Sequence, residues 1–332
     1  MRKKGNWGRL SLGVALTLLI LGISATGFAQ KMKISYGGTS ASSGSYVSTV
    51  TVCKAINDGV AEVNVTNVET GASVENARLL SRGDVDFCLL DVSIQDRLWN
   101  GLEEFKGHQN QNIRNLWLTT VIPHTVFVTK ESGITSINQL TGKKFAPGFT
   151  GSATAALAMR LFEANGIKPA WYRSGLSAMV DAVKNREIVG YVKSGFPDTT
   201  VQDIASLIPV VLLPITDEAL AKGNAKYPGM YVRTIGPAKS YSGQDQDVPT
   251  YPVIMHDTST TKLSEDLAYK MCKAIYNARD KIAKSYKYAN VILDFPKSSL
   301  IGPIPIHAGL YKFCKEMGIQ VPERLIPPEA KR

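Results

Sequence analysis

Short apolar strands alternate with amphipathic helices in the first part of this chain, and this alternation restricts the possible folds more than any other feature. Phe87–Leu90 is apolar at every position, which is typical of a strand buried on both faces. The predicted strands are residues 33–36, 63–68 and 87–90, and the predicted helices between them are residues 46–58 and 73–81. This order predicts an α/β domain with a mostly parallel sheet and helices on both of its faces.

The middle of the chain repeats the alternation. Its expected strands are residues 125–129, 144–146, 188–192 and 209–213, and its expected helices are residues 152–165 and 176–184. The chain then returns through a strand at 251–255 to a long helix at 264–281, followed by helical stretches at 286–293 and 307–317. These last helices have no further strands to cover, so we expect them to pack on the first α/β unit.

This order of strands and helices is explained by two α/β lobes. Two segments of the chain, near residues 124–130 and 246–256, cross between the lobes. The expected boundaries are 30–126 for the first part of lobe 1, 127–249 for lobe 2 and 250–332 for the return to lobe 1. A length of 332 residues suits two domains of roughly 150 residues each. Because small ligands bind preferentially in clefts between domains, we expect the functional site there.

The first 29 residues have the pattern of a secretory signal peptide. Residues 2–9 carry basic side chains and no acid, residues 10–23 are apolar, and Gly27 and Ala29 supply the small residues before a cleavage site at Gln30. The alternative is a membrane anchor, but a helix over 10–23 spans only about 21 Å of a hydrocarbon core of roughly 30 Å.

Removal of residues 1–29 lowers the net charge from +10 to +6, since this segment contains four basic residues and no acidic one. The mature chain has no long basic run, so a nucleic-acid partner is not expected, and only a weak attraction for anions follows. No Cys follows the apolar segment, so no lipid anchor is expected. These features predict a periplasmic protein, which we expect to be monomeric.

Four cysteines occur, at positions 53, 88, 272 and 314. An even number in an oxidising compartment permits disulfides, in more than one pairing. Cys53 and Cys88 lie in apolar segments, where buried free thiols are the alternative. No CxxC spacing supports a zinc or redox site.

Three loops rich in small and hydroxyl residues precede predicted helices: Gly37–Ser45, Thr70–Asn76 and Pro147–Thr154. Ordinary helix capping explains any one of them, but three such helix N-termini meeting at one cleft predict an anion or carboxylate site. The candidate ligand-binding residues are Gly38, Thr39, Ser43, Gly44, Tyr46, Gly71, Ser73, Asn76, Thr150, Gly151, Ser152, Ala153, Thr154 and Lys193.

Motifs of enzymes, metals and cofactors are missing from the sequence. None of the four histidines has a metal-ligand partner at helical spacing, and neither a GxSxG elbow nor a nucleotide-binding glycine motif occurs. Ser259–Lys262 matches the SxxK motif, but its companion motifs SDN and KTG do not occur in the sequence, so this match does not support a catalytic site. We therefore expect no catalytic residues, no metal and no cofactor, although distant residues could still assemble a catalytic site.

The chain resembles the TAXI family, the TRAP-associated extracytoplasmic solute receptors, over nearly the whole mature length. The matching segments are Tyr36–Thr39, Gly44–Tyr46, Thr70–Asn76, Leu79–Leu80, Gly83–Phe87, Gly151–Thr154, Gly195–Pro197, Tyr241–Thr250 and Pro305–Gly309. Tyr241–Thr250 is the most specific of them. The sequence departs from its relatives at Ser40–Ser43, at Asp91–Ser93 and at Lys193.

This resemblance implies the type II periplasmic-binding-protein fold, a hinged receptor whose cleft closes on a ligand. It implies a small organic anion as ligand, such as glutamate or a 2-oxo dicarboxylate, and a TRAP-type membrane permease as partner. The alternatives are a receptor of a tripartite tricarboxylate or ABC importer, or a periplasmic enzyme on the same fold.

The most detailed expectation concerns a ligand carboxylate at the start of the helix near Ser152. Four N–H groups there lack helical partners, Gly151 lets the backbone approach, and the Ser152 and Thr154 hydroxyls are expected to donate as well. Lys193 is expected to neutralise a second negative charge. For His307, by contrast, we expect a structural role at the start of its helix.

Overall fold

The computed structural model describes residues 31–331 except positions 40, 42–44, 72 and 151. The predicted signal peptide lies outside the described residues, as do Ser43, Gly44 and Gly151 of the predicted site. The signal peptide therefore stays a prediction.

The elements alternate as the sequence predicts, with several additions. The strands are β1 (Met32–Gly37), β2 (Val63–Val68), β3 (Phe87–Asp91), β4 (Ile113–Thr129), β5 (Lys144–Phe145), β6 (Ala170–Trp171), β7 (Gly190–Ser194), β8 (Val210–Leu212), β9 (Thr234–Gly236), β10 (Val248–Thr250) and β11 (Pro252–Thr260). The α-helices are α1 (Tyr46–Gly59), α2 (Ser73–Arg82), α3 (Val92–Asn100), α4 (Ala153–Ala164), α5 (Leu176–Lys184), α6 (Thr199–Leu207), α7 (Asp217–Lys226), α8 (Glu265–Ser285) and α9 (Ala308–Glu316).

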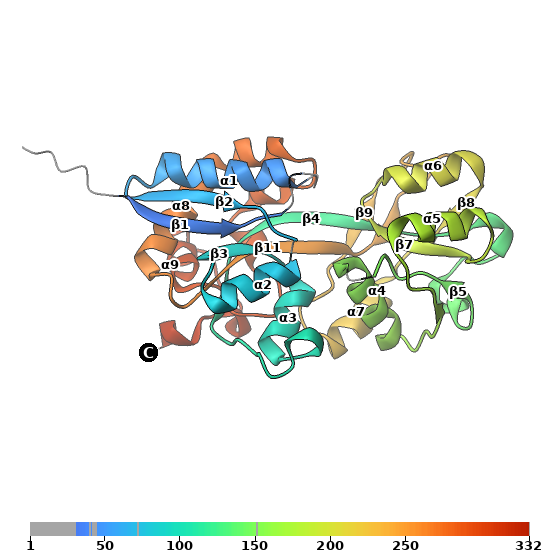
Figure 1. The fold of residues 1–332 in the computed structure, drawn as a ribbon, viewed down its shortest axis with the longest axis horizontal. Coiled ribbons are helices and arrows are strands. Elements are labelled where there is room, and N and C mark those ends of the chain that lie inside the picture. Colours follow the sequence, from blue (N-terminus) through green and yellow to red (C-terminus); the bar gives the residue numbers. More distant parts are fainter. Residues whose placement is uncertain (1–30, 40, 42–44, 72, 151, 332) are drawn as a thin grey trace, which may run out of the picture. The chain divides into compact units, whose positions relative to one another are not determined.

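The main sheet is mixed, with the order β2-β1-β3-β11-β4-β7 and β8 paired to β4. β1 is parallel to β2 and to β3, as expected. β11 is antiparallel to both β3 and β4, and β4 is antiparallel to β7. The expectation of a mostly parallel sheet is therefore wrong outside β1–β3, because β4 leaves the first α/β unit and β11 comes back beside it in the opposite direction (Figure 1).

One hydrophobic core joins the beginning and the end of the chain. Ile34 and Ile56 share it with Met271 and Leu310 from the last helices. α1 and α8 lie side by side on the same face of the sheet (Figure 1). A Cβ at Gly59 would lie 2.6 Å from that of Ala274, so a larger residue there would force the two helices apart. We call this unit the first lobe.

The core of the middle segment is separate. It forms two clusters built on β4, β7 and helices α4–α7, with Val126, Leu161, Val192 and Ile204 among the fully or nearly fully buried members. We call this unit the second lobe; its boundaries at residues 127 and 249 stay a prediction.

Details at helix ends confirm some expectations and correct others. His307 caps α9 by accepting from Gly309 N–H at 3.1 Å, which is the structural role predicted for it. The helix expected at 286–293 is wrong, because only a short 3₁₀ turn, Asn290–Asp294, forms there.

All four cysteines are buried and free, which favours the interpretation of Cys53 and Cys88 as buried thiols.

Asp257 on β11 is a carboxyl group inside the first lobe, fully removed from solvent. The Thr119 hydroxyl donates to it, but burial dominates and raises the pKa of Asp257 to about 7. An unfolded aspartate titrates near pH ~3.9. Between these values the native state holds a proton that the unfolded state has lost, so stability falls as the pH rises through this window and levels off above it.

The substitution Asp257→Asn should remove this pH dependence. We expect the free energy of unfolding of the wild type to fall by more than about 1 kcal/mol per pH unit between pH ~4 and ~7 relative to the variant. Urea unfolding at several pH values measures the difference. Asp58→Asn, at an exposed position of α1, should keep the wild-type profile, and parallel curves for wild type and Asp257→Asn would contradict the assignment.

Candidate functional site

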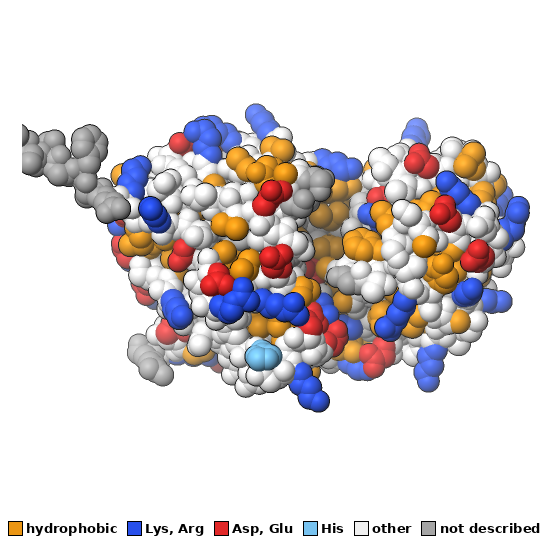
Figure 2. Space-filling view, in the orientation of Figure 1, with side chains coloured by type: hydrophobic (Ala, Val, Ile, Leu, Met, Phe, Trp, Pro, Cys, Tyr) orange, Lys and Arg blue, Asp and Glu red, His pale blue; other side chains and the backbone are white. Residues whose placement is uncertain are grey.

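A cleft of about 870 Å³ lies between the two lobes. The first lobe contributes the start of α2 and the segment around α3, and the second lobe contributes α4, β6 and the residue after α7. The lining residues of the first lobe are Val74, Arg97, Leu102, Glu103 and Glu104, and those of the second lobe are Ser152, Ala155, Ala156, Met159, Arg160, Glu163, Trp171, Arg173 and Tyr227. Figure 2 shows the hollow between the lobes, with hydrophobic side chains inside it.

The N-terminus of α4 opens onto this cleft through Ser152. Ser152 Oγ accepts from Ala155 N–H at 3.1 Å and donates to the Phe149 carbonyl at 2.7 Å. Its proton is therefore used inside the loop. The backbone N–H groups of Ala153 and Thr154 have no partner among the described residues, so they are the donors that this helix end offers.

Thr154 is tied to the strand that connects the lobes. Its hydroxyl lies 3.3 Å from His124 Nε2, and His124 Nδ1 lies 2.9 Å from the Tyr251 carbonyl. A carbonyl only accepts, so Nδ1 carries the proton and Nε2 accepts from Thr154. Burial lowers the pKa of His124 to about 3, which keeps the ring neutral in this arrangement. The Thr154 hydroxyl thus links α4 to β4.

Lys193, at the end of β7, is neutralised within the second lobe. Its Nζ lies 3.2 Å from Asp198 Oδ2, and both side chains are mostly buried. This ion pair offsets the charge of Lys193, whose expected contact with a second negative charge of the ligand stays a prediction. Asp198 was not among the predicted residues, although its position before Thr199–Leu207 is a recognisable N-cap signal.

A chain of hydrogen bonds holds the Lys193–Asp198 loop on β4. Asp198 N–H donates to Tyr241 Oη at 2.8 Å, Tyr241 lies 2.6 Å from Thr125 Oγ1, and Thr125 donates to the Gly195 carbonyl at 2.7 Å. Tyr241 opens the most specific segment of the family resemblance. Tyr241 has a structural role in that segment, because its hydroxyl holds the Lys193–Asp198 loop beside β4.

The predicted residues of the first lobe form a structural clamp. Asn76 Nδ2 donates to the carbonyls of Gly38 and Leu89, at 2.9 and 2.8 Å, and so ties α2 to the residue after β1 and to the middle of β3. Ser73 Oγ accepts from Asp91 N–H at 3.2 Å. These contacts shape the wall beside Val74 of the cleft but leave few groups free for a ligand.

The remaining predicted ligand-binding residues differ in their exposure to solvent. Thr39 is buried, Tyr46 is half-buried at the first position of α1, and Gly71 and Thr150 are exposed. Gly71 N–H donates to Glu75 at 2.6 Å, and Thr150 N–H donates to the Ser174 carbonyl at 2.9 Å. The second contact places the loop before α4 beside Arg173.

Two charged residues that the sequence analysis did not choose stand out. Arg173 lines the cleft, and its only polar contact among the described residues is Met159 Sδ at 3.9 Å. Asp91 is fully buried at the end of β3, where Oδ1 accepts from Ser93 and Oδ2 has no partner among the described residues. Burial raises the pKa of Asp91. Arg173 belongs to no motif, and the sequence marks Asp91 only as part of the departure at Asp91–Ser93.

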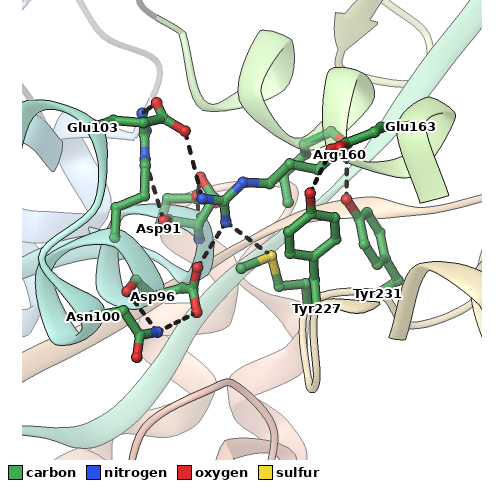
Figure 3. A network of polar contacts seen from close by, with 12 residues as sticks. Asp91, Asp96, Asn100, Glu103, Arg160, Glu163, Tyr227 and Tyr231 are labelled. Carbon is green, nitrogen blue, oxygen red and sulfur yellow. Dashed lines mark hydrogen bonds and ion pairs between the residues drawn. The ribbon is translucent and has the colours of Figure 1, made fainter. Parts of the chain in front are cut away.

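A network of charges spans the cleft (Figure 3). Arg160 of α4 forms ion pairs with Asp96 of α3 at 2.8 Å and with Glu103 at 3.5 Å. Arg97 pairs with Glu103 at 2.7 Å and with Glu104 at 3.1 Å. Three carboxylates of this part of the cleft, those of Asp96, Glu103 and Glu104, thus share the two guanidinium groups of Arg97 and Arg160. Arg173 has no ion pair among the described residues.

Two lobes linked by paired strands, with a charged cleft between them, are the architecture of the two-lobed binding-protein fold. The chain belongs to the NMT1-like family, whose model matches residues 37–318. A search of curated proteins gives no significant match.

Solved structures of similar fold include solute-binding proteins. A TctC solute binding protein from Polaromonas is 12% identical, with a TM-score of 0.50 over 83% of this chain and 91% of that one. The periplasmic aliphatic sulphonate binding protein SsuA from Escherichia coli is 13% identical, with a TM-score of 0.48 over 90% of this chain and 93% of that one. The first similarity supports the two-lobe fold.

The strand order β2-β1-β3-β11-β4, with a returning strand inserted between β3 and β4, is that of the type II class expected from the sequence. Among the described helices, none is both long and apolar enough to cross a bilayer.

The substitution Tyr241→Phe tests the loop that carries Lys193. Loss of the hydroxyl leaves the Asp198 N–H without its acceptor, so the free energy of unfolding should fall by about 1–3 kcal/mol. Urea unfolding measures this change. Tyr311→Phe is the matched control, because the Tyr311 hydroxyl has no hydrogen-bond partner among the described residues. Equal stability of the two variants would show that the Tyr241 hydrogen bonds contribute little.

Proposed function

We propose that this protein is a periplasmic receptor of the TAXI type, which captures a small organic anion and delivers it to a TRAP-type permease. The family, the two-lobe fold and the segments shared with TAXI receptors support this function. The proposal includes export through a cleaved signal peptide at residues 1–29, the lobe boundaries 30–126, 127–249 and 250–332, a monomeric state and no catalytic activity.

One observation carries the choice of an anion. The N-terminus of α4 faces the cleft beside Arg173, an arginine without a carboxylate partner among the described residues. A helix N-terminus and a guanidinium both favour negative charge. We therefore place a ligand carboxylate between the N–H groups of Ala153 and Thr154 and the Arg173 side chain. Arg173 thus shares the first carboxylate with the start of α4, whereas Lys193 was expected at a second negative charge.

The first test is a thermal-shift screen of organic acids and amino acids on the mature protein. A ligand at about one hundred times its dissociation constant adds about 2.7 kcal/mol of stability, which raises the melting temperature measurably. Stabilisation by mono- and dicarboxylates supports the proposal, whereas stabilisation only by cationic or neutral solutes contradicts it. The glutamate and 2-oxo dicarboxylate classes are the first compounds to screen.

The partner is tested by transport. Proteoliposomes that contain a TRAP-type permease from the same genome should take up the ligand only when the receptor is added. Uptake that instead requires an ATP-hydrolysing importer or a tripartite tricarboxylate permease would favour the alternative receptor classes.

The substitution Arg173→Gln should weaken ligand binding by about tenfold or more, the typical value of a charge-assisted hydrogen bond. Ser152→Ala should leave the affinity nearly unchanged, because Ser152 already donates to Phe149, and should instead lower stability by about 0.5–2 kcal/mol through the lost cap. Calorimetry measures both affinities. Arg186→Gln is the control, since Arg186 is an exposed arginine of the second lobe paired with Glu131. Unchanged affinity in Arg173→Gln places the carboxylate elsewhere.

A further inference from the structure

The ion pair between Arg160 and Asp96 joins the two lobes directly. Arg160 extends from α4 of the second lobe, and Asp96 lies on α3 of the first lobe (Figure 3). Their atoms are 2.8 Å apart, and the two side chains are only 9% and 15% exposed. Such a pair is screened by solvent much less than an ordinary surface salt bridge.

Each partner of this pair is held in place by its own lobe. Asp96 Oδ1 accepts from Asn100 Nδ2 at 2.9 Å, while Asp96 Oδ2 is left to face Arg160. The guanidinium of Arg160 lies over the Tyr227 ring at 5.0 Å, which favours a cation. Both side chains are thus already oriented for the contact before the lobes meet.

A second carboxylate reinforces the contact. Glu103, just after α3, lies 3.5 Å from Arg160 and is held at 2.7 Å by Arg97 of its own lobe. Arg97 is itself nearly buried and also pairs with Glu104. The first lobe therefore presents a prearranged pair of carboxylates to one arginine of the second lobe.

We infer that Arg160, Asp96 and Glu103 form a latch that holds the lobes together before any ligand binds. The latch residues Arg160 and Glu103 also line the cleft, so this contact between the lobes lies at the cleft itself. Another contact between the lobes, Phe196 N–H to the Tyr288 hydroxyl at 2.9 Å, is neutral and responds less to salt. The inference concerns the ligand-free protein and holds whatever the ligand is.

The latch sets how much of the ligand-free protein is open. For a ligand that enters only the open form, the apparent affinity is the intrinsic affinity multiplied by the open fraction. A strong latch lowers this fraction and therefore also lowers the observed association rate. Weakening the latch should therefore increase the open population and the association rate together. Salt should act in the same direction, because it screens the charges.

The test measures the distance between the lobes without a ligand. Spin labels on Gln111→Cys in the first lobe and Lys184→Cys in the second lobe report this distance, because both positions are exposed while the four native cysteines are buried. We expect the wild type to give mainly one short distance. In the double variant Asp96→Asn, Glu103→Gln, the fraction of molecules at a longer distance should rise tenfold or more. High salt should raise this fraction in the wild type by a smaller factor.

Glu163→Gln is the matched control. Glu163 also lines the cleft, but it pairs with Lys226 and Tyr227 of its own lobe, so its loss should leave the distance distribution unchanged. Arg160→Lys, which keeps a charge but loses the guanidinium, should give an intermediate shift. The inference is overturned if the folded double variant keeps the wild-type distribution, or if Glu163→Gln opens the protein equally.

Discussion

The pairing of β4 with β11 is the constraint on which the rest of this structure depends. The two strands run antiparallel from Thr260 and Ile113 in the first lobe to Pro252 and Pro123 at its edge. β4 then continues into the second lobe, where it pairs with β7 and β8. One uninterrupted strand thus belongs to both lobes. His124 and Thr125, which anchor α4 and the Lys193 loop, lie on it where the lobes join.

Much of the fold was predictable because its signals are local. Periodicity located β1–β3, α1, α2 and α8 to within a few residues, and Ser264 caps α8 as a serine before two acids suggests. Three helices were not predicted. Asp91, Asp198 and Thr216 cap α3, α6 and α7 and were readable signals, but Asp91 is also the last residue of the buried strand β3, which hides the start of α3. The direction of β11 depends on where the chain returns, which no local pattern records.

The candidate site was predictable only in outline. The loop before α4 was found because glycine and hydroxyl residues precede a helical period, and Ser152 does line the cleft. What each side chain does there was not predictable, because partners come from distant positions. Lys193 meets Asp198 and Thr154 meets His124. Arg160 and Asp96 are 64 positions apart and belong to no motif, so their pairing appears only when α3 and α4 are placed together.

The four buried, unpaired thiols have a consequence for how the chain matures. No cross-link among Cys53, Cys88, Cys272 and Cys314 contributes to the structure, so non-covalent contacts alone hold the folded chain. Folding then requires neither an oxidant nor a disulfide isomerase. The same native chain can form in a reducing or an oxidising solution, and redox conditions that would dismantle a disulfide-stapled receptor leave this one intact.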